Sequence, residues 1–158
     1  MEAQAEKLYK EKKFKEVEDM FSTLLKESEG EADTIKAREY NNRGHAKYMQ
    51  VEFEEALKDY DQALKLDPSL TVAKYNRGTI LYRLSKFEQA RDDLKAAVEA
   101  EGNNQDYQEA LQKCQAELKW KKKVALKKYF IIVRPLIWVT QCDVKLLTFR
   151  IGRKKVVL

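Results

Sequence analysis

Two asparagines offer the clearest binding chemistry in the sequence. Asn42 and Asn76 lie 34 residues apart, and each precedes an Arg-Gly dipeptide. A carboxamide donates and accepts hydrogen bonds at once, which suits it to hold the amide groups of an extended peptide. Tyr48 and Tyr82 recur at the same interval, and with Tyr9 they would supply rigid apolar area with a polar tip. The spacing indicates a peptide-binding surface that repeats along the chain.

Enzymatic chemistry has little support from the residue types. The single histidine, His45, has no cysteine or serine beside it or one helical turn away, so a nucleophile would lack its base. One histidine with the widely separated Cys114 and Cys142 does not make a zinc site. The five glycines form no phosphate-binding fingerprint. We therefore expect no enzyme activity, no cofactor and no metal, and the two cysteines predict a reduced intracellular compartment.

An internal repeat predicts the elements that position these residues. The sequence matches itself at an offset of 34 residues, a period typical of paired-helix solenoids. A glycine in the first helix lets its neighbour approach closely, and an alanine in the second helix is the small partner. An aromatic residue at the start of the second helix fills the wedge between them. The matched pairs are Gly44 with Gly78, Phe53 with Phe87, Ala56 with Ala90, Asp59 with Asp93, and Ala63 with Ala97.

The repeated segments resemble a known family. Tyr40–Pro68, YNNRGHAKYMQVEFEEALKDYDQALKLDP, resembles a tetratricopeptide repeat, and Tyr75–Gly102 resembles a second one. The resemblance implies an all-α fold, a short right-handed superhelix of antiparallel helix pairs whose first helices line a concave groove. The positions that define the repeat, and that it assigns to packing, are Gly44, Phe53, Ala56, Tyr60, Ala63, Pro68, Gly78, Phe87, Ala90 and Ala97.

The same template divides the whole chain. We predict a degenerate first repeat at residues 1–31, in which Ala5 replaces the expected glycine and Val17 the expected alanine. Repeats follow at 37–70 and 71–104. Tyr107, Leu111 and Cys114 begin an apolar stripe that predicts a capping helix over 105–128. Residues 129–158 are expected to form an irregular basic and hydrophobic tail.

The groove candidates are the residues of the first helices that do not face the partner helix. Arg43 and Arg77 are not among them and are expected to lay their stems over the core. The tyrosines have two interpretations, because they either contact a ligand or only pack helix against helix. The candidates are Arg38, Asn41, Asn42, His45, Tyr48, Tyr75, Asn76, Thr79, Tyr82 and Arg83.

We expect a non-enzymatic adaptor or scaffold that binds a peptide or helix of another protein in this groove. A subset of the family grips the C-terminal carboxylate of heat-shock chaperones with Lys, Asn and Arg residues. Of that set only Asn42 is matched, and Glu2 and Glu6 occupy places expected to hold Lys and Asn. Because these carboxylates would repel a carboxylate ligand, chaperone tails are not expected as partners. Self-association is an alternative, since about three repeats are usually needed for stability.

The C-terminal segment is chemically unlike the rest. Residues 1–118 carry 19 Lys+Arg against 25 Asp+Glu, whereas residues 119–158 carry 12 against 1. Membrane or nucleic-acid binding is therefore expected only through residues 119–158, with the lysines contacting anionic lipid or phosphates. A third interpretation, which we favour, is that the segment has no evolved role. Pro135 predicts a break in any helix there, and the longest uncharged apolar stretch is too short to span a membrane. We expect a cytoplasmic protein, with a nuclear location left open.

Overall fold

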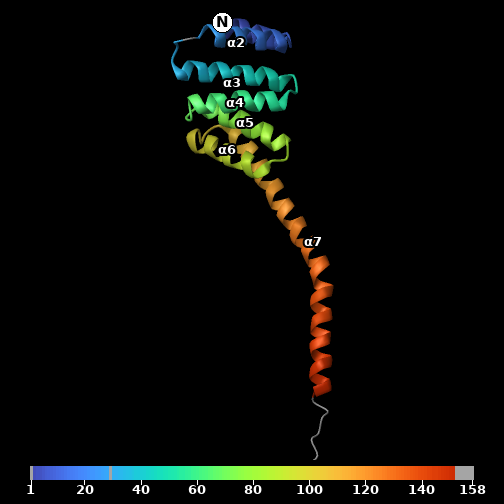
Figure 1. The fold of residues 1–158 in the computed structure, drawn as a ribbon. Coiled ribbons are helices and arrows are strands. Elements are labelled where there is room, and N and C mark those ends of the chain that lie inside the picture. Colours follow the sequence, from blue (N-terminus) through green and yellow to red (C-terminus); the bar gives the residue numbers. More distant parts are fainter. Residues whose placement is uncertain (1, 29, 152–158) are drawn as a thin grey trace, which may run out of the picture. The chain divides into compact units, whose positions relative to one another are not determined.

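The computed structural model describes the backbone of residues 2–28 and 30–151 and the side chains of residues 3–28 and 30–128. Within this range the chain is all-α, with its helices in sequential pairs (Figure 1). The chain divides into two units, Met1–Glu117 and Leu118–Leu158. The helices are α1 (Glu2–Lys10), α2 (Phe14–Glu27), α3 (Asp33–Met49), α4 (Phe53–Leu66), α5 (Thr71–Arg83), α6 (Phe87–Ala100) and α7 (Gln105–Ile151).

Three hairpin turns share one backbone geometry. Lys12, Val51 and Ser85 have φ values of 57°, 67° and 59°, and each precedes the residue before a phenylalanine that starts the second helix. In each turn the amide of the left-handed residue donates to the carbonyl of the tyrosine three residues earlier, at 3.0 Å. The turn between α1 and α2 therefore matches the turns of the two clear repeats. The interpretation of residues 1–31 as a first, degenerate repeat stays a prediction.

The two glycines of the repeat lie where helices touch most closely. A Cβ built on Gly44 would lie 3.0 Å from Tyr60 Cε1, and one built on Gly78 would lie 2.9 Å from Leu94 Cγ. Both distances are shorter than ordinary van der Waals contact. Glycine is therefore required at these positions by the approach of α4 to α3 and of α6 to α5.

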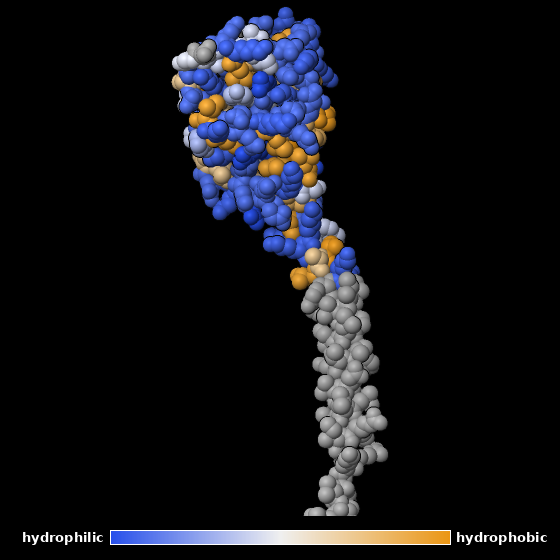
Figure 2. Space-filling model, in the orientation of Figure 1, coloured by the Kyte–Doolittle hydropathy of each residue, from blue (hydrophilic) through white to orange (hydrophobic). Residues whose placement is uncertain are grey.

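Small and aromatic side chains fill the core around these contacts. In α4 and α6 the repeat alanines Ala56, Ala63, Ala90 and Ala97 are fully buried, and Tyr60 is 1% exposed. In the first pair Val17 and Phe21 pack with Ala5 and with Ala46 of α3. Figure 2 shows that the outer face of this region is mainly hydrophilic, with apolar side chains between the polar ones. The core is thus a narrow layer that continues from one helix pair to the next.

The ends of the repeats are closed by polar groups. Pro68 lies two residues after Leu66, the last residue of α4, and the carboxylate of Asp67 accepts hydrogen bonds from the amide and hydroxyl of Ser69 at 2.9 and 2.6 Å. Before α7, Asn104 Oδ1 accepts from the amides of Asp106 and Tyr107, as an N-cap residue does. The Asn104 cap satisfies backbone groups that the start of α7 would otherwise leave unpaired.

The prediction of an irregular tail is wrong over residues 129–151. The capping helix predicted at 105–128 begins at Gln105 as expected, but α7 continues through Pro135 to Ile151. A proline removes one backbone hydrogen bond and clashes with the preceding turn, yet it does not decide the conformation of the residues on either side. The β-propensity of this segment depends on packing partners and so was a weak guide. Residues 152–158 of the predicted tail lie outside the described residues.

In the second unit, the described side chains of α7 are strongly basic. Lys119, Lys121, Lys122, Lys123, Lys127 and Lys128 are exposed, and Trp120 is 62% exposed. Over the residues that the structure describes, none of the helices has the length and apolarity needed to cross a bilayer. The binding of lipid or nucleic acid through this segment stays a prediction.

Candidate functional site

A chain of three carboxamides crosses from α5 to α3. Asn76 Nδ2 donates to Asn41 Oδ1 at 3.0 Å, and Asn41 Nδ2 donates to Asn42 Oδ1 at 3.2 Å. Asn41 is 6% exposed, whereas Asn42 and Asn76 are half-buried. Within the described residues, Asn42 Nδ2 and Asn76 Oδ1 have no hydrogen-bond partner. This chain of carboxamides therefore ends in one free donor and one free acceptor, and Asn41 holds the other two side chains in place.

Aromatic rings line α1 and α3 beside these amides. The ring centroids of Tyr9 and His45 are 5.2 Å apart, and those of His45 and Tyr48 are 6.2 Å apart. Tyr9 Oη also donates to the backbone carbonyl of Asn42 at 3.1 Å. Burial lowers the pKa of His45 and raises the pKa of Tyr9 to about 12, so both rings are uncharged at neutral pH. The surface is apolar and hydrogen-bonding but carries little charge here.

Two of the tyrosines also serve the hairpins. The ring of Tyr48 lies 5.9 Å from that of Phe53, and the ring of Tyr82 lies 5.4 Å from that of Phe87. Both tyrosines therefore contact the turn phenylalanine of their own helix pair. Tyr48 additionally lies under the guanidinium of Arg83, with 5.4 Å between Cζ and the ring centroid. This cation–π contact links α3 to α5.

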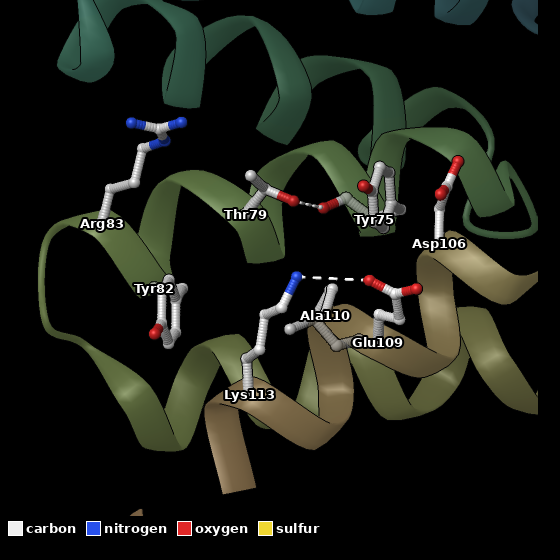
Figure 3. Close-up of a pocket in the computed structure, with 9 residues that line it drawn as sticks. Tyr75, Thr79, Tyr82, Arg83, Asp106, Glu109, Ala110 and Lys113 are labelled. Carbon is white, nitrogen blue, oxygen red and sulfur yellow. Dashed lines mark hydrogen bonds and ion pairs between the residues drawn. The ribbon is translucent and has the colours of Figure 1, made fainter. Parts of the chain in front are cut away.

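A pocket of about 450 Å³ lies between α5 and the start of α7 (Figure 3). Tyr75 forms its wall, with its ring centroid 4.5 Å from that of Tyr107. Thr79 donates its hydroxyl to the carbonyl of Tyr75 at 2.9 Å. In Figure 3, Lys113 of α7 pairs with Glu109 of the same helix at 3.3 Å. The pocket lining is Tyr75, Thr79, Tyr82, Arg83, Leu94, Asp106, Glu109, Ala110 and Lys113.

A second pocket, of about 460 Å³, lies between α1 and α3. Ala5, Glu6, Tyr9 and Lys10 of α1 form one side of it, and Asn42 of α3 forms the other. Phe21 of α2 closes the floor. Of the predicted groove residues, Arg38 is exposed and lines neither pocket. Asn42, Tyr75, Thr79, Tyr82 and Arg83 line one pocket or the other.

Two aspartates of the repeat have a role that the sequence did not reveal. Asp59 accepts from Arg43 Nε and Nη2 at 2.8 and 2.6 Å and pairs with Lys47 at 2.8 Å. Asp93 accepts from Arg77 Nε and Nη2, both at 2.7 Å. These hydrogen bonds raise the pKa of both guanidinium groups.

The sequence predicts only that Arg43 and Arg77 cover the core. In the structure, each arginine is hydrogen-bonded to an aspartate on the second helix of its own pair. The signal was present, since arginine and aspartate recur together at 16 residues' separation in both repeats. Each pair lies away from the pocket linings and is part of the scaffold that positions them.

Over the described residues, no set of three or more His, Cys, Asp or Glu side chains is arranged to bind a metal ion. Cys114 is buried, and its thiol donates to the carbonyl of Phe87 at 3.2 Å.

Comparison with known proteins identifies the repeats. Residues 37–70 and 72–104 each match a family model described as tetratricopeptide repeat. The Protein STIP1 homolog of Dictyostelium discoideum is 41% identical over 64 residues, which cover 40% of this chain and 11% of that protein. The DnaJ homolog subfamily C member 7 homolog of Schizosaccharomyces pombe is 28% identical over 120 residues, covering 76% and 25%. The chain thus spans a quarter or less of the length of these relatives.

Solved structures share the fold across most of the chain. The first TPR of Spaghetti (RPAP3), bound to the HSP90 peptide SRMEEVD, superposes with a TM-score of 0.65 at 26% identity, covering 74% of this chain and 89% of that one. The second TPR domain of human RPAP3, in complex with the HSP70 peptide SGPTIEEVD, gives 0.62 at 26% identity, covering 72% and 91%. The Sgt2 TPR domain from Aspergillus fumigatus gives 0.68 at 19% identity, covering 77% and 78%, and shares the fold. Residues 37–70 and 72–104 of this chain are thus two tetratricopeptide repeats, set in an all-α array of helix pairs.

Proposed function

We propose that the chain is a non-enzymatic adaptor that binds a peptide segment of another protein on the surface formed by α1, α3, α5 and the start of α7. The observation that carries the proposal is the carboxamide chain from Asn76 through Asn41 to Asn42. It presents one free donor and one free acceptor on neighbouring helices, and these are the two groups that a peptide backbone can satisfy. The peptide complexes of the RPAP3 repeats support a peptide as the class of ligand.

The burial of these groups favours a ligand over water. Asn42 and Asn76 are held in place by Asn41, so little conformational entropy is lost when a peptide binds. The rings of Tyr9, His45 and Tyr48 beside them offer apolar area to the same ligand. A hydrogen bond in such partly dry surroundings is stronger than one made in open solvent.

Acidic chaperone tails do not fit this surface well. Glu6 lines the pocket between α1 and α3, and Asp106 and Glu109 line the pocket between α5 and α7. Lys10 balances Glu6 in the first pocket, and Arg83 and Lys113 balance the two carboxylates of the second, so neither pocket offers the net positive charge that a peptide such as SRMEEVD, with two glutamates and an aspartate, would need. We therefore propose that the ligand of this chain is a segment without such a run of acidic residues.

Replacing both outer asparagines tests the proposal. Peptides would first be selected from a displayed random library on the full chain, and their Kd measured by fluorescence anisotropy. Two hydrogen bonds contribute about 0.5–1.5 kcal/mol each, so Asn42→Ala with Asn76→Ala should weaken binding roughly tenfold or more.

Asn103→Ala provides the matched control, because this asparagine is exposed in the turn before α7. Its Kd should equal that of the wild type. If the double variant also bound the selected peptides with wild-type affinity, the carboxamides would not be part of the site and the proposal would fail.

A further inference from the structure

The two pockets use equivalent positions of the repeat. Both have one wall from the first helix of a pair and a floor residue from the second helix. Four of the five lining residues of α1 and α2 have a lining counterpart 73 residues later in α5 and α6, so both pockets open on the same face of the first unit. The equivalent pairs are Glu6 with Thr79, Tyr9 with Tyr82, Lys10 with Arg83, and Phe21 with Leu94.

The seam between the two pockets is bridged by side chains. Asn76 donates to Asn41 across it at 3.0 Å, and Arg83 covers the ring of Tyr48 at 5.4 Å. The groove surface therefore alternates, with a pocket between α1 and α3, a bridged polar seam between α3 and α5, and a pocket between α5 and α7. A ligand lying along it would place a side chain in each pocket and its backbone over the carboxamides.

The distance between the pockets sets the spacing of those side chains. Packed helices lie about 8–10 Å apart. The two pockets are separated by two helices, α3 and α5, and therefore lie about 16–20 Å apart. An extended chain rises about 3.3 Å per residue, and a span of about 16–20 Å therefore takes five or six residues. Six residues also return a side chain to the same side in both a β-strand, of period two, and a polyproline II helix, of period three.

We infer that this groove binds an extended segment of another protein through two large apolar side chains six residues apart, one in each pocket. The inference rests on the proposed function and adds the chemistry of its ligand. Each pocket, at about 450 Å³, falls in the size range of ligand-binding pockets. Rings of Tyr9 in one pocket and of Tyr75 and Tyr82 in the other supply apolar walls.

The charges at the pocket rims favour uncharged anchors. Glu6 pairs with Lys10 at 2.7 Å in the first pocket, and Glu109 pairs with Lys113 at 3.3 Å in the second. Arg83 and Asp106 add one charge of each sign to the second pocket. Both rims are thus balanced in formal charge, and neither selects an acidic or a basic anchor by net charge. An apolar side chain has no hydrogen bonds to water that it would lose on entering them.

A spacing series tests the inference on the full chain. Blocked twelve-residue peptides of Ser, Thr and Asn would carry two phenylalanines separated by two to nine positions, with single-phenylalanine peptides and SRMEEVD as comparisons. Burying a second aromatic ring strengthens binding roughly tenfold or more. We expect the tightest binding at a separation of six, and single-phenylalanine peptides and SRMEEVD should bind at least roughly tenfold more weakly.

Variants that fill one pocket show which pocket holds each ring. Glu6→Phe fills the first, and Ala110→Phe or, if that variant unfolds, Thr79→Phe fills the second. Each should reduce the affinity of the best peptide to that of a single-phenylalanine peptide. Glu55→Phe, on the exposed side of α4, is the matched control and should leave it unchanged.

Three results would overturn the two-anchor inference. One is equal affinity at all separations, and the second is equal affinity of the pocket-filling variants and the control. The third is a dimer of the full chain that the best peptide does not dissociate, because it would assign the pockets to a second copy. In the first two cases a loss of binding in the Asn42 and Asn76 variant would still support the proposed function, so the two failures are distinguishable.

Discussion

Replacing Asp59 by alanine should lower the free energy of unfolding by about 3 kcal/mol, in the range found when one partner of a buried ion pair is removed. The side chain of Asp59 is 5% exposed and holds both Arg43 and Lys47. Without it, two cations that are 20% and 12% exposed lose their main counter-charge. Urea unfolding of the full chain, followed by circular dichroism at 222 nm, measures the change.

Asp61→Ala is the matched control on the same helix. Asp61 also contacts an arginine, Arg77 Nη1 at 2.8 Å, but it is 60% exposed. Exposed ion pairs contribute little, so this variant should cost less than about 1 kcal/mol. Equal effects of the two substitutions would mean that Asp59 does not hold α3 to α4 in the way that the structure shows.

The second large effect on stability is expected at the close contact between α5 and α6. Leu94→Ala should lower the free energy of unfolding by about 2–5 kcal/mol, because Leu94 is fully buried and its replacement by alanine leaves a cavity. Gly78→Ala should also destabilise, since overpacking costs about 1–3 kcal/mol against a gain in helix propensity of about 1 kcal/mol. In the double variant the new methyl group occupies space that Leu94 has vacated. The combined loss should therefore be smaller than the sum by at least about 1 kcal/mol.

Gly102 provides the control for this double-mutant cycle. A Cβ built there meets only the carbonyl of Val98, at the ordinary contact distance of 3.5 Å. The effects of Gly102→Ala and Leu94→Ala on the free energy of unfolding should thus be additive. If Gly78→Ala were additive with Leu94→Ala as well, the close contact between the two helices would not exist in solution.

The helix pairs could be predicted because their causes are local or periodic. Glycine at 44 and 78, alanine at 56 and 90, and an aromatic residue at each turn are visible in the sequence at a fixed interval. The structure gives these positions their physical reason, because a Cβ on either glycine would press against the facing helix. A repeat in the sequence thus reports a contact that is repeated in space.

The details of the site could not be predicted in the same way. Asn41 is equivalent to Tyr75 in the repeat, so its hydrogen bond with Asn76 joins positions that do not match each other. Contacts between one repeat and the next depend on how two helices are placed, which periodicity does not give. The groove prediction therefore included Asn41 as a contact residue, whereas the structure buries it as a support.

The C-terminal helix shows the limit of local rules. Pro135 and the β-branched residues around it suggested a break, yet α7 passes through this segment. Secondary-structure propensities are differences of a few tenths to about 1 kcal/mol per residue. A single proline costs more, about 3 kcal/mol, but a long helix on both sides can offset it. A residue-by-residue reading does not weigh the length of a helix against the cost of one proline.

Nuclear magnetic resonance can show whether the first helices carry the binding surface. The full chain, labelled with ¹⁵N, would be titrated with the tightest selected peptide while backbone and side-chain amide signals are followed. We expect shifts of the Asn42 and Asn76 side-chain amides and of backbone amides in α1, α3, α5 and Gln105–Lys113. Shifts confined to α2, α4 and α6, with both asparagine side chains unmoved, would contradict it.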